Sequence, residues 1–507
     1  MKNIFILIST VLIIVFSSNI KAQDKKDLKN LDNYIEKYVD EFNMPGFAVG
    51  IIKNGEVVFM ETYGVKNVET GKKVDENTLF GIASCSKAFT SACISILVEQ
   101  GKLNWKDKVV DHLPGFTLYD PYLTAELSVE DLLAHRSGYK TFDGDLLWYG
   151  TQRTTADVVN QFKYRENPYS LREEFGYSNL MFITAGELIK SITGQSWGEF
   201  VTENILLPIE MESSTITNKG FEENKDAAWP HLDGKVMEFI NYDNIGGAGA
   251  INSSIKDMMN WIQLVLNKGE TGDTSIYSKR NYYKMTALHT PLNAGKGETV
   301  DGTHFSGYGL GWFLKDYQGR KIIHHGGGLP GFHSKVVVVP EDNLAYVILA
   351  NQLSALIPAI DRKILNFYLN PTDTTNWAAK YLVYEKGQEK KLEEKWDKLA
   401  EERILDTKPS VADSLFTGIY EDKMYGHAKI EIANDQLKIT LLPTAKLFNS
   451  IMEHWHYNTF KIKFADPFLP PGFVTFNFNE EGNIIGFKIK MDAPDFHFND
   501  LDFLKTK

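Results

Sequence analysis

The stretch Ser84 to Gly101, SCSKAFTSACISILVEQG, combines a serine, a lysine three residues later and a run of apolar residues. This spacing predicts a core helix that begins near Ser84 and ends at Gly101, because glycine commonly follows the last helical turn. On the first turn of such a helix, Ser84 and Lys87 lie on one face. The lysine amine can then take the serine's proton, provided that burial or nearby charge keeps the amine neutral.

Two further motifs follow along the chain, Tyr177-Ser178-Asn179 and His325-Gly326-Gly327-Gly328. An S-x-x-K motif alone is common by chance, but the three motifs together predict an active site. A serine hydroxyl needs a base to become a nucleophile, and Lys87 is the nearest candidate. Tyr177 is a second candidate if the lysine charge lowers its pKa. In an alternative interpretation, Asn179 only caps the helical pattern that runs to Ile192.

The length of 507 residues predicts two domains rather than one. Residues 1–22 read as a signal peptide, with a charged start at Lys2, an apolar stretch from Ile4 to Phe16 and a small residue at Ala22. The chain is therefore predicted to be exported, to the periplasm or the medium, with no membrane span after cleavage. An uncleaved anchor helix is the alternative, although the apolar stretch is short for a span.

The chain carries 54 Lys+Arg against 66 Asp+Glu, a net charge of -12. This balance argues against nucleic acid and against anionic membrane surfaces as partners. Cys85 and Cys93 are the only cysteines. Eight residues apart on one helix, they are separated by roughly 12 Å and cannot form a disulfide with each other. The oligomeric state is left open.

Alternating apolar residues at Gly46–Ile52 and Val57–Glu61 flank Asn54-Gly55, the strongest short signal for a β-hairpin. Strand patterns return far downstream, and the residues between the two groups are mainly helical in pattern. We therefore predict an α+β fold in which a mostly antiparallel sheet is completed by both ends of the domain and flanked by helices. The downstream strands are expected at 321–325, 335–339 and 345–349, and the helices around 132–133, 180–192 and 258–266.

The stretch Trp377 to Ile404 is dense in Lys and Glu and predicts an amphipathic linking helix. After Pro409 the pattern becomes short alternating strands, which predicts a small all-β domain, barrel-like or a sandwich. Within it, 430–432 should pair with 437–441, and 474–478 with 484–489. The expected organisation is a signal peptide at 1–22, a main domain at 23–370, a helical linker at 371–409 and the β domain at 410–507.

These motifs resemble those of the serine β-lactamase and penicillin-binding protein superfamily, and most closely its class C-like branch, which includes D-amino-acid peptidases and esterases. The resemblance covers roughly Leu31 to Leu365. It extends to the turn Leu132–Gly138, LLAHRSG, to GGAG at 246–249 and to GLPGF at 328–332. The tail after Phe416 resembles a β-rich domain often appended to such hydrolases. A β-lactamase/transpeptidase-like fold is implied.

The resemblance implies Ser84, Lys87 and Tyr177 as catalytic residues, with Asn179 binding the substrate amide and holding Lys87. The N–H groups of Ser84 and Gly328 would form an oxyanion hole, and Gly327 would belong to the same substrate-binding strand. No cofactor is implied. A zinc site at His324, His325 and His333 is not expected, because neighbouring strand residues point to opposite faces.

His325 stands where β-lactamases and transpeptidases of this superfamily place the lysine of a K-T-G strand. Histidine carries at most a partial charge at neutral pH, which weakens carboxylate binding. The predicted function is a serine hydrolase that forms an acyl-enzyme with a small amide or ester, D-amino-acid-containing peptides being one candidate. Its partner would be a small molecule or a short peptide. A β-lactamase or penicillin-binding DD-carboxypeptidase is one alternative, and a non-catalytic cell-wall-binding protein is another.

Selectivity is expected to depend on the segments Tyr139–Arg153 and Pro230–Asn244. The C-terminal segment Asp422–His427 is polar with an aromatic tip, Tyr425. One hypothesis has it reach over the active-site cleft and limit substrate length, since loops often carry specificity. The alternative is a plain hairpin turn.

Overall fold

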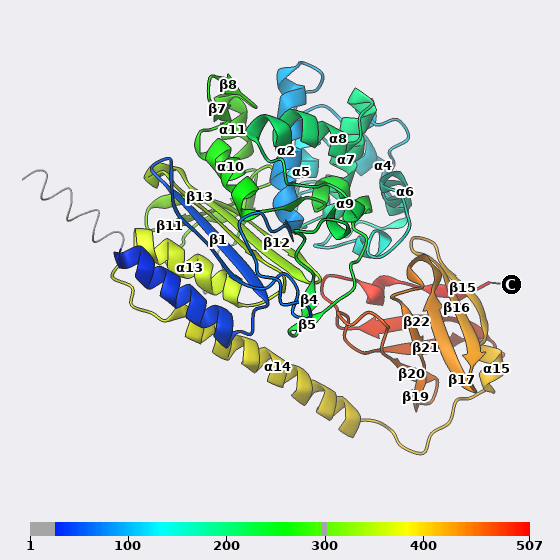
Figure 1. The fold of residues 1–507 in the computed structure, drawn as a ribbon. Coiled ribbons are helices and arrows are strands. Elements are labelled where there is room, and N and C mark those ends of the chain that lie inside the picture. The colour runs from blue at the N-terminus through cyan, green and yellow to red at the C-terminus, as the bar shows by residue number, and fades with distance from the viewer. Residues whose placement is uncertain (1–25, 294, 296–301, 507) are drawn as a thin grey trace, which may run out of the picture.

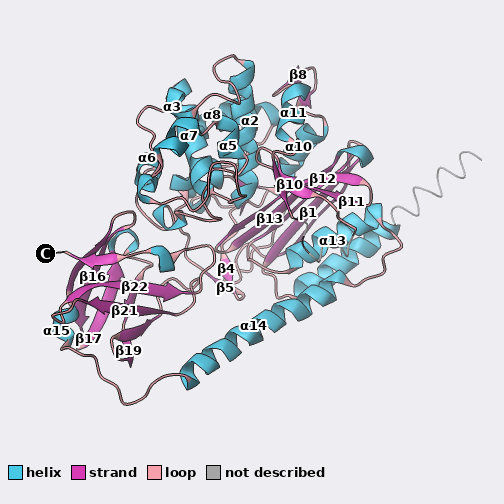
Figure 2. Ribbon diagram, turned by 180° about the vertical axis from the view of Figure 1, so that it is seen from behind, coloured by secondary structure: helices cyan, strands magenta, loops and turns pink. Residues whose placement is uncertain are grey.

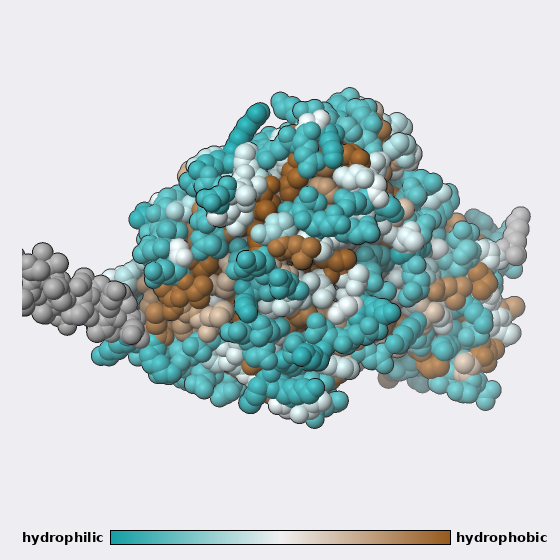
Figure 3. Space-filling view, turned by 45° about the horizontal axis from the view of Figure 1, so that its top comes forward, coloured by the Kyte–Doolittle hydropathy of each residue, from teal (hydrophilic) through white to brown (hydrophobic). Residues whose placement is uncertain are grey.

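The computed structural model describes residues 26–293, 295 and 302–506 (Figure 1). A helical and β-sheet domain is joined by the long helix α14 (Trp377–Glu401) to a smaller all-β domain. The proposed signal peptide lies outside the described residues. Within the described residues, no helix has both the length and the apolar character needed to cross a membrane. On the face drawn in Figure 3, apolar areas are separated by hydrophilic residues.

The first domain is built on an antiparallel sheet that has eight strands in the described part of the chain, in the order β2-β1-β14-β13-β12-β11-β10-β9. The first strand in sequence, β1, pairs with the last, β14, so both ends of the domain meet inside the sheet, as predicted. The strands are β1 (Gly46–Lys53), β2 (Glu56–Gly64), β9 (Thr290–Leu292), β10 (Ser306–Tyr308), β11 (Phe313–Tyr317), β12 (Arg320–Leu329), β13 (Phe332–Val339) and β14 (Leu344–Ala350).

The hairpin between β1 and β2 turns at Asn54 and Gly55, whose φ values are 56° and 80°. Two consecutive positive φ angles are what a type I′ turn requires, and the Asn-Gly pair adopts them readily. Strands β9 to β11 were not predicted from the sequence. β9 and β10 are three residues long and contain Pro291 and Gly307, so no alternating pattern can develop in them.

Helices cover both faces of this sheet (Figure 2). Alternate residues of β1 serve the two faces: Val49 and Ile51 pack under the helix over residues 26–41 and α13 (Leu356–Leu369). Ala48 and Ile52 face the larger helical layer. That layer includes α2 (Ser86–Glu99), α3 (Val109–His112), α4 (Pro121–Glu126), α5 (Val129–Leu133), α6 (Thr155–Gln161), α7 (Asn179–Thr193), α8 (Trp197–Val201), α9 (Asn218–Glu222), α10 (Ile255–Leu266) and α11 (Lys279–Met285).

Helix α2 is the central helix of this layer and is buried on every side from Ser86 to Leu97. Phe89 stacks on Trp261 of α10 with ring centroids 3.7 Å apart. The helix ends at Glu99 with Gln100 as its C-cap, followed by Gly101 with a φ of 67°. The sequence prediction of a core helix is confirmed, and the 3₁₀ turn that carries Ser84 directly precedes it and contacts β12 and β13 of the sheet.

Helix α14 leaves the first domain along α13 and runs beneath the sheet toward the second domain (Figure 1). Ala378 is its one buried residue, which agrees with the high content of Lys and Glu. Near its C-terminal end, the ring of Trp396 lies 5.8 Å from that of Phe473, which belongs to the second domain. The helix therefore contacts both of the domains that it joins.

The C-terminal domain, which contains β15 to β23, is a nearly closed antiparallel barrel with nine strands in the described residues, in the order β18-β17-β16-β15-β23-β22-β21-β20-β19. The predicted pairings are confirmed: Ile430 lies opposite Ile439, and Val474 opposite Ile489. The strands are β15 (Gly418–Asp422), β16 (Gly426–Ala433), β17 (Gln436–Leu441), β18 (Asn449–Ile451), β19 (Glu453–His456), β20 (Thr459–Ile462), β21 (Gly472–Phe478), β22 (Ile484–Met491) and β23 (Phe503–Lys505), preceded by α15 (Asp413–Phe416).

Candidate active site

The three sequence motifs meet at one cavity of about 470 Å³, which we call the cleft. Its volume lies in the range typical of small-molecule sites. The turn before α2, the start of α7 and the end of β12 supply one wall each. The predicted site residues that line it are Ser84, Tyr177, Asn179, His325 and Gly328.

Ser84 lies in a 3₁₀ turn, Ala83–Cys85, directly before α2. Ala83 has a φ of 48°, a left-handed conformation that alanine rarely adopts. Behind the turn, Ser334 Oγ of β13 donates a hydrogen bond of 2.7 Å to the Ile82 carbonyl. Ser84 is partly exposed, whereas the residues on either side of it are buried. The turn thus presents one hydroxyl to the cleft from a fixed backbone.

Gly327 explains how β12 comes close to this turn. A Cβ atom at Gly327 would lie 2.2 Å from the Ile82 carbonyl oxygen and 2.3 Å from Ser334 Oγ, so only glycine fits. At Gly326 the nearest atom is 3.8 Å away, and at Gly328 it is 3.4 Å away. Gly327 packs behind the Ser84 turn and is not one of the residues that line the cleft, whereas Gly326 and Gly328 are.

Lys87 is completely buried, and its Nζ contacts three oxygen atoms: Ser84 Oγ at 3.0 Å, Asn179 Oδ1 at 2.7 Å and the Ala248 carbonyl at 2.8 Å. Burial lowers the pKa of Lys87 to about 7, against the opposing effect of the negative charge of Asp145. In the neutral amine, two N–H groups satisfy Asn179 and Ala248, and the lone pair faces the Ser84 hydroxyl. The condition for Lys87 to act as a base is therefore met.

Asn179 opens α7, but the helix cap is its neighbour: Ser178 Oγ accepts a hydrogen bond of 3.3 Å from the Met181 N–H. The interpretation of Asn179 as a mere cap is wrong. Its Oδ1 accepts from Lys87, and its Nδ2 donates to Asp145 Oδ2 at 2.7 Å. A chain of hydrogen bonds thus connects Ser84, Lys87, Asn179 and Asp145.

Asp145 was not predicted from the sequence. It is buried at the start of a 3₁₀ turn, Asp145–Leu147, directly after Gly144, and it also lines the cleft. Burial raises the pKa of Asp145 to about 7. Its Oδ1 has no hydrogen-bond partner in the described part of the chain. No sequence motif signals it, since it lies 34 residues before Asn179 in a loop.

Tyr177 is buried among aromatic rings, with that of His135 at a centroid distance of 4.2 Å. Burial raises the pKa of Tyr177 above its ordinary value, and a side-chain hydrogen bond with Ser84 opposes this rise only in part. The lowering by the lysine charge that we considered is therefore not found, and the phenol keeps its proton. His135 Nδ1 accepts a hydrogen bond of 3.0 Å from the Ser178 N–H, which fixes the backbone beside Tyr177.

His325 is buried and neutral. Its Nδ1 donates to the Gly326 carbonyl at 2.6 Å, and its Nε2 accepts from the Tyr308 hydroxyl at 2.9 Å. Burial lowers the pKa of His325 to about 3. The position that holds a lysine in K-T-G enzymes therefore carries no charge in this chain. His324 points elsewhere and contacts Lys335 Nζ at 2.9 Å.

The C-terminal domain also lines the cleft, through Phe468, Asp495 and Phe496. The segment Asp422–His427, which one hypothesis placed over the cleft, contributes no lining residue, so that hypothesis is wrong. The alternative of a hairpin turn is confirmed, since Asp422 of β15 pairs with Gly426 of β16. Its tip, Tyr425, is buried: the hydroxyl lies 2.9 Å from Thr444 Oγ1, and its carbonyl accepts a hydrogen bond from Arg153. Of the two expected selectivity segments, 139–153 lines the cleft through Thr141, Phe142, Asp145 and Trp148, whereas 230–244 lines a smaller cavity beside it.

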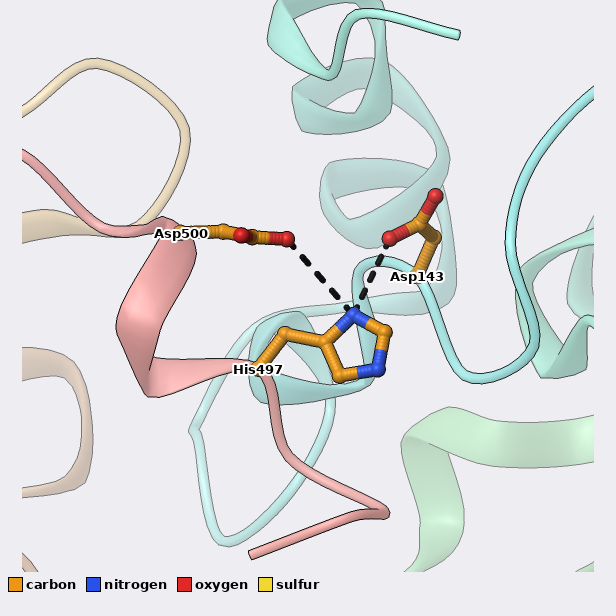
Figure 4. Close-up of side chains that lie close together, drawn as sticks. All are labelled: Asp143, His497 and Asp500. Carbon is orange, nitrogen blue, oxygen red and sulfur yellow. Dashed lines mark hydrogen bonds and ion pairs between the residues drawn. The ribbon is translucent and has the colours of Figure 1, made fainter. Parts of the chain in front are cut away.

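An ion-pair cluster joins the two domains beside this wall (Figure 4). His497 Nδ1 lies 3.1 Å from Asp143 Oδ1 and 3.7 Å from Asp500 Oδ2. Arg165 Nη2 donates to both carboxylates, at 2.7 and 2.5 Å. Asp143, His497 and Asp500 are close enough together to hold a metal ion, but Arg165 already supplies the positive charge. We therefore interpret the cluster as a bridge between the domains.

Comparison with known proteins matches both domains. The family model described as Beta-lactamase matches residues 31–366, and the model described as a domain of unknown function (DUF3471) matches residues 402–505. Among solved structures, the octameric penicillin-binding protein homologue from Pyrococcus abyssi superposes with a TM-score of 0.58 at 21% identity, covering 94% of this chain and 100% of that one. The penicillin-binding protein from Bacillus halodurans gives 0.55 at 21% identity, over 66% and 99%. At this identity, the structures show the fold alone.

Two curated relatives are more similar in sequence. "Unguisins hydrolase ungD'" from Aspergillus campestris is 29% identical over 354 residues, which is 65% of this chain and 63% of that protein. "Protein flp" from Staphylococcus aureus (strain MW2) is 27% identical over 339 residues, or 66% and 64%. The chain thus spans less than two thirds of the length of these relatives. Because the family model covers more than half of the sequence, this chain belongs to the Beta-lactamase family.

Proposed function

We propose that this protein is a serine hydrolase that forms an acyl-enzyme at Ser84 with a small amide or ester substrate. One observation carries the proposal: Lys87 Nζ lies 3.0 Å from Ser84 Oγ, and the two N–H groups of the neutral amine are already committed to Asn179 and Ala248. A binding protein has no need of a buried amine whose lone pair faces a hydroxyl. This argues against the non-catalytic alternative.

In the proposed reaction, Ser84 Oγ bonds to the acyl carbon while its proton passes to Lys87 Nζ. The N–H groups of Ser84 and Gly328 would stabilise the oxyanion, and such donors typically contribute about 100- to 1,000-fold in rate. When the bond to the leaving group breaks, the Tyr177 hydroxyl gives the departing amine or alcohol a proton. Tyr177 recovers a proton from the Lys87 ammonium, whose nitrogen lies 4.8 Å from the phenol ring centroid. Water then releases the acyl group by the same steps in reverse.

The neutral state of His325 favours this function over a β-lactamase or DD-carboxypeptidase, because those activities bind a substrate carboxylate next to the scissile bond. We retain D-amino-acid-containing peptides as a candidate substrate class. The pattern of residues 1–22 supports export as a further part of the proposal, to the periplasm or the medium.

The test is hydrolysis of p-nitrophenyl acetate by the mature protein, with mass spectrometry of the acylated chain. Ser84→Ala should abolish both turnover and the covalent adduct. Ser91→Ala is the matched control, since it removes a buried hydroxyl of the same helix that has no hydrogen-bond partner in the described residues. Cys85→Ser should also stay active, because the Cys85 thiol is buried and its pKa is raised to about 11. Equal activity of Ser84→Ala and wild type would refute the proposal.

A further inference from the structure

The wall that the C-terminal domain adds to the cleft has a distinct composition. Phe468 and Phe496 are apolar, and Asp495, which directly precedes Phe496, brings a carboxylate to the same cavity. Asp495 is exposed, and it forms no hydrogen bond or ion pair with the described residues. Partial burial of its carboxyl group raises the pKa of Asp495, and the nearby His497 opposes this rise. It is therefore an acid without a counter-ion among the described residues, and it lines the same cavity as Ser84.

The cleft as a whole is negatively charged. Of the described residues that line it, Asp145 and Asp495 can carry a negative charge, and no lysine or arginine is present. Lys87 lies behind the surface of the cleft and, in the neutral form that acts as the base, carries no charge. His325 is neutral, as shown above. The negative charge of Asp495 also raises the pKa of Asp145, so the two acids act on the same region of the cleft. A substrate carboxylate would be repelled here, and an ammonium group attracted.

The position of Asp495 is fixed from both sides. The ring of Phe496 lies 4.3 Å from that of Tyr149, in the loop of the first domain that carries Asp145. One residue further, His497 joins the interdomain cluster with Asp143. Tyr149 in turn donates a hydrogen bond of 2.8 Å to Asp466, close to Phe468 in the chain. The wall is thus held in place by contacts on both its apolar and its charged side.

We propose that Asp495 binds a protonated amine of the substrate, while Phe468 and Phe496 contact an adjoining apolar group. This assignment rests on the proposed function and makes it more specific: the preferred acyl donor carries a free amine and an apolar side chain, and an anionic donor is disfavoured. The C-terminal domain would then determine specificity in a reaction that the first domain carries out.

The experiment measures binding rather than turnover, so that it does not depend on the chemistry at Ser84. Full-length Ser84→Ala protein is titrated calorimetrically with D- and L-phenylalaninamide and with their N-acetyl forms, which lack the charge. One enantiomer of phenylalaninamide will bind better than the other. For that enantiomer, we expect the free amine to bind more tightly than the N-acetyl form. Adding Asp495→Asn should weaken binding of the amine by roughly 10- to 100-fold, as expected for a hydrogen bond to a charged group, and leave the N-acetyl form unchanged.

Asp492→Asn is the matched control, because Asp492 is an exposed acid of the same segment that pairs with Lys395 instead. Asp495→Glu should restore part of the affinity. An equal affinity for amine and N-acetyl forms, or an unchanged affinity in Asp495→Asn, would overturn the assignment. The ester assay of Ser84→Ala judges the proposed function separately, so failure of one can be told from failure of the other.

Discussion

Replacing Asp145 with Asn should make Lys87 a base at lower pH. The negative charge of Asp145 raises the pKa of Lys87, against the larger lowering by burial. Asn has nearly the same shape and can still accept the hydrogen bond from Asn179 Nδ2. The substitution therefore removes the charge and keeps the geometry. Since kcat/KM reports ionisation of the free enzyme, its ascending limb should follow Lys87.

The size of the effect follows from the hydrogen-bond chain. Lys87 Nζ to Asn179 Oδ1 is 2.7 Å, and Asn179 Nδ2 to Asp145 Oδ2 is also 2.7 Å. With roughly 2.3 Å across the amide, the two charges lie at most roughly 8 Å apart. At an effective dielectric constant of about 20, they interact by roughly 2 kcal/mol, or ~1.5 pKa units. Because the pKa of Asp145 is itself raised to about 7, only part of its charge is present there. We expect a downward shift of about one pH unit.

The assay is kcat/KM for p-nitrophenyl acetate between pH 5 and pH 8.5, corrected for spontaneous hydrolysis. The wild type should show an ascending limb near pH 7, since the neutral fraction of Lys87 grows through its pKa of about 7. In Asp145→Asn the limb should move toward pH 6, whereas Asp492→Asn should leave it in place. Lys87→Met should lose at least about 100-fold in rate. An unmoved limb in Asp145→Asn, or a limb that persists in Lys87→Met, would refute Lys87 as the base.

Two further pairs of substitutions test the supporting geometry. Gly327→Ala should lower both the thermal midpoint and the ester activity, because its Cβ would meet the Ile82 carbonyl at 2.2 Å, whereas Gly326→Ala, whose nearest atom is 3.8 Å away, should be tolerated. Equal melting curves for the two variants would contradict this. Asn179→Ala should reduce kcat with little loss of stability, since it releases Lys87. Ser178→Ala should instead cost about 1 kcal/mol in the free energy of unfolding, as removal of a helix cap does; the reverse pattern in denaturation and kinetics would show that Asn179 is the structural residue.

Much of this fold could be predicted because its elements have local signals. The Asn54-Gly55 turn, the apolar run after Lys87 and the strand patterns at 321–349 each depend on neighbours in sequence. Strands β9 to β11 lack such signals: they are short and are defined by pairing with one another and with β12. The four motif residues could be predicted because each lies at the start of a helix with a clear apolar pattern. Ser84 and Lys87 lie at the start of α2, and Tyr177 and Asn179 at the start of α7.

Other parts of the site depend on how distant segments pack, and a single sequence does not reveal this. Asp143 and Asp145 are two acids in one loop, and nothing in the sequence shows that one faces His497 while the other faces Asn179. Likewise, the segments around Tyr425 and Phe496 both place an aromatic residue close to acids. Which of them meets the cleft is decided by the side of the barrel that faces the first domain.

The loop that carries Asp143 and Asp145 links the proposed catalytic residues to the second domain. Gly144, with a φ of 81°, separates Asp143 from Asp145. On one side of it, Asp143 is paired with Arg165 and with His497 of the C-terminal domain; on the other, Asp145 holds Asn179 and sets the charge felt by Lys87. The same anchor that positions Asp495 and Phe496 therefore also restrains the loop that carries Asp145. The barrel contacts this loop at three positions, Asp143, Tyr149 and Arg153. A domain that only stabilised the fold would not need to contact the loop that carries Asp145. Contact at all three positions places the C-terminal domain in the construction of the cleft itself.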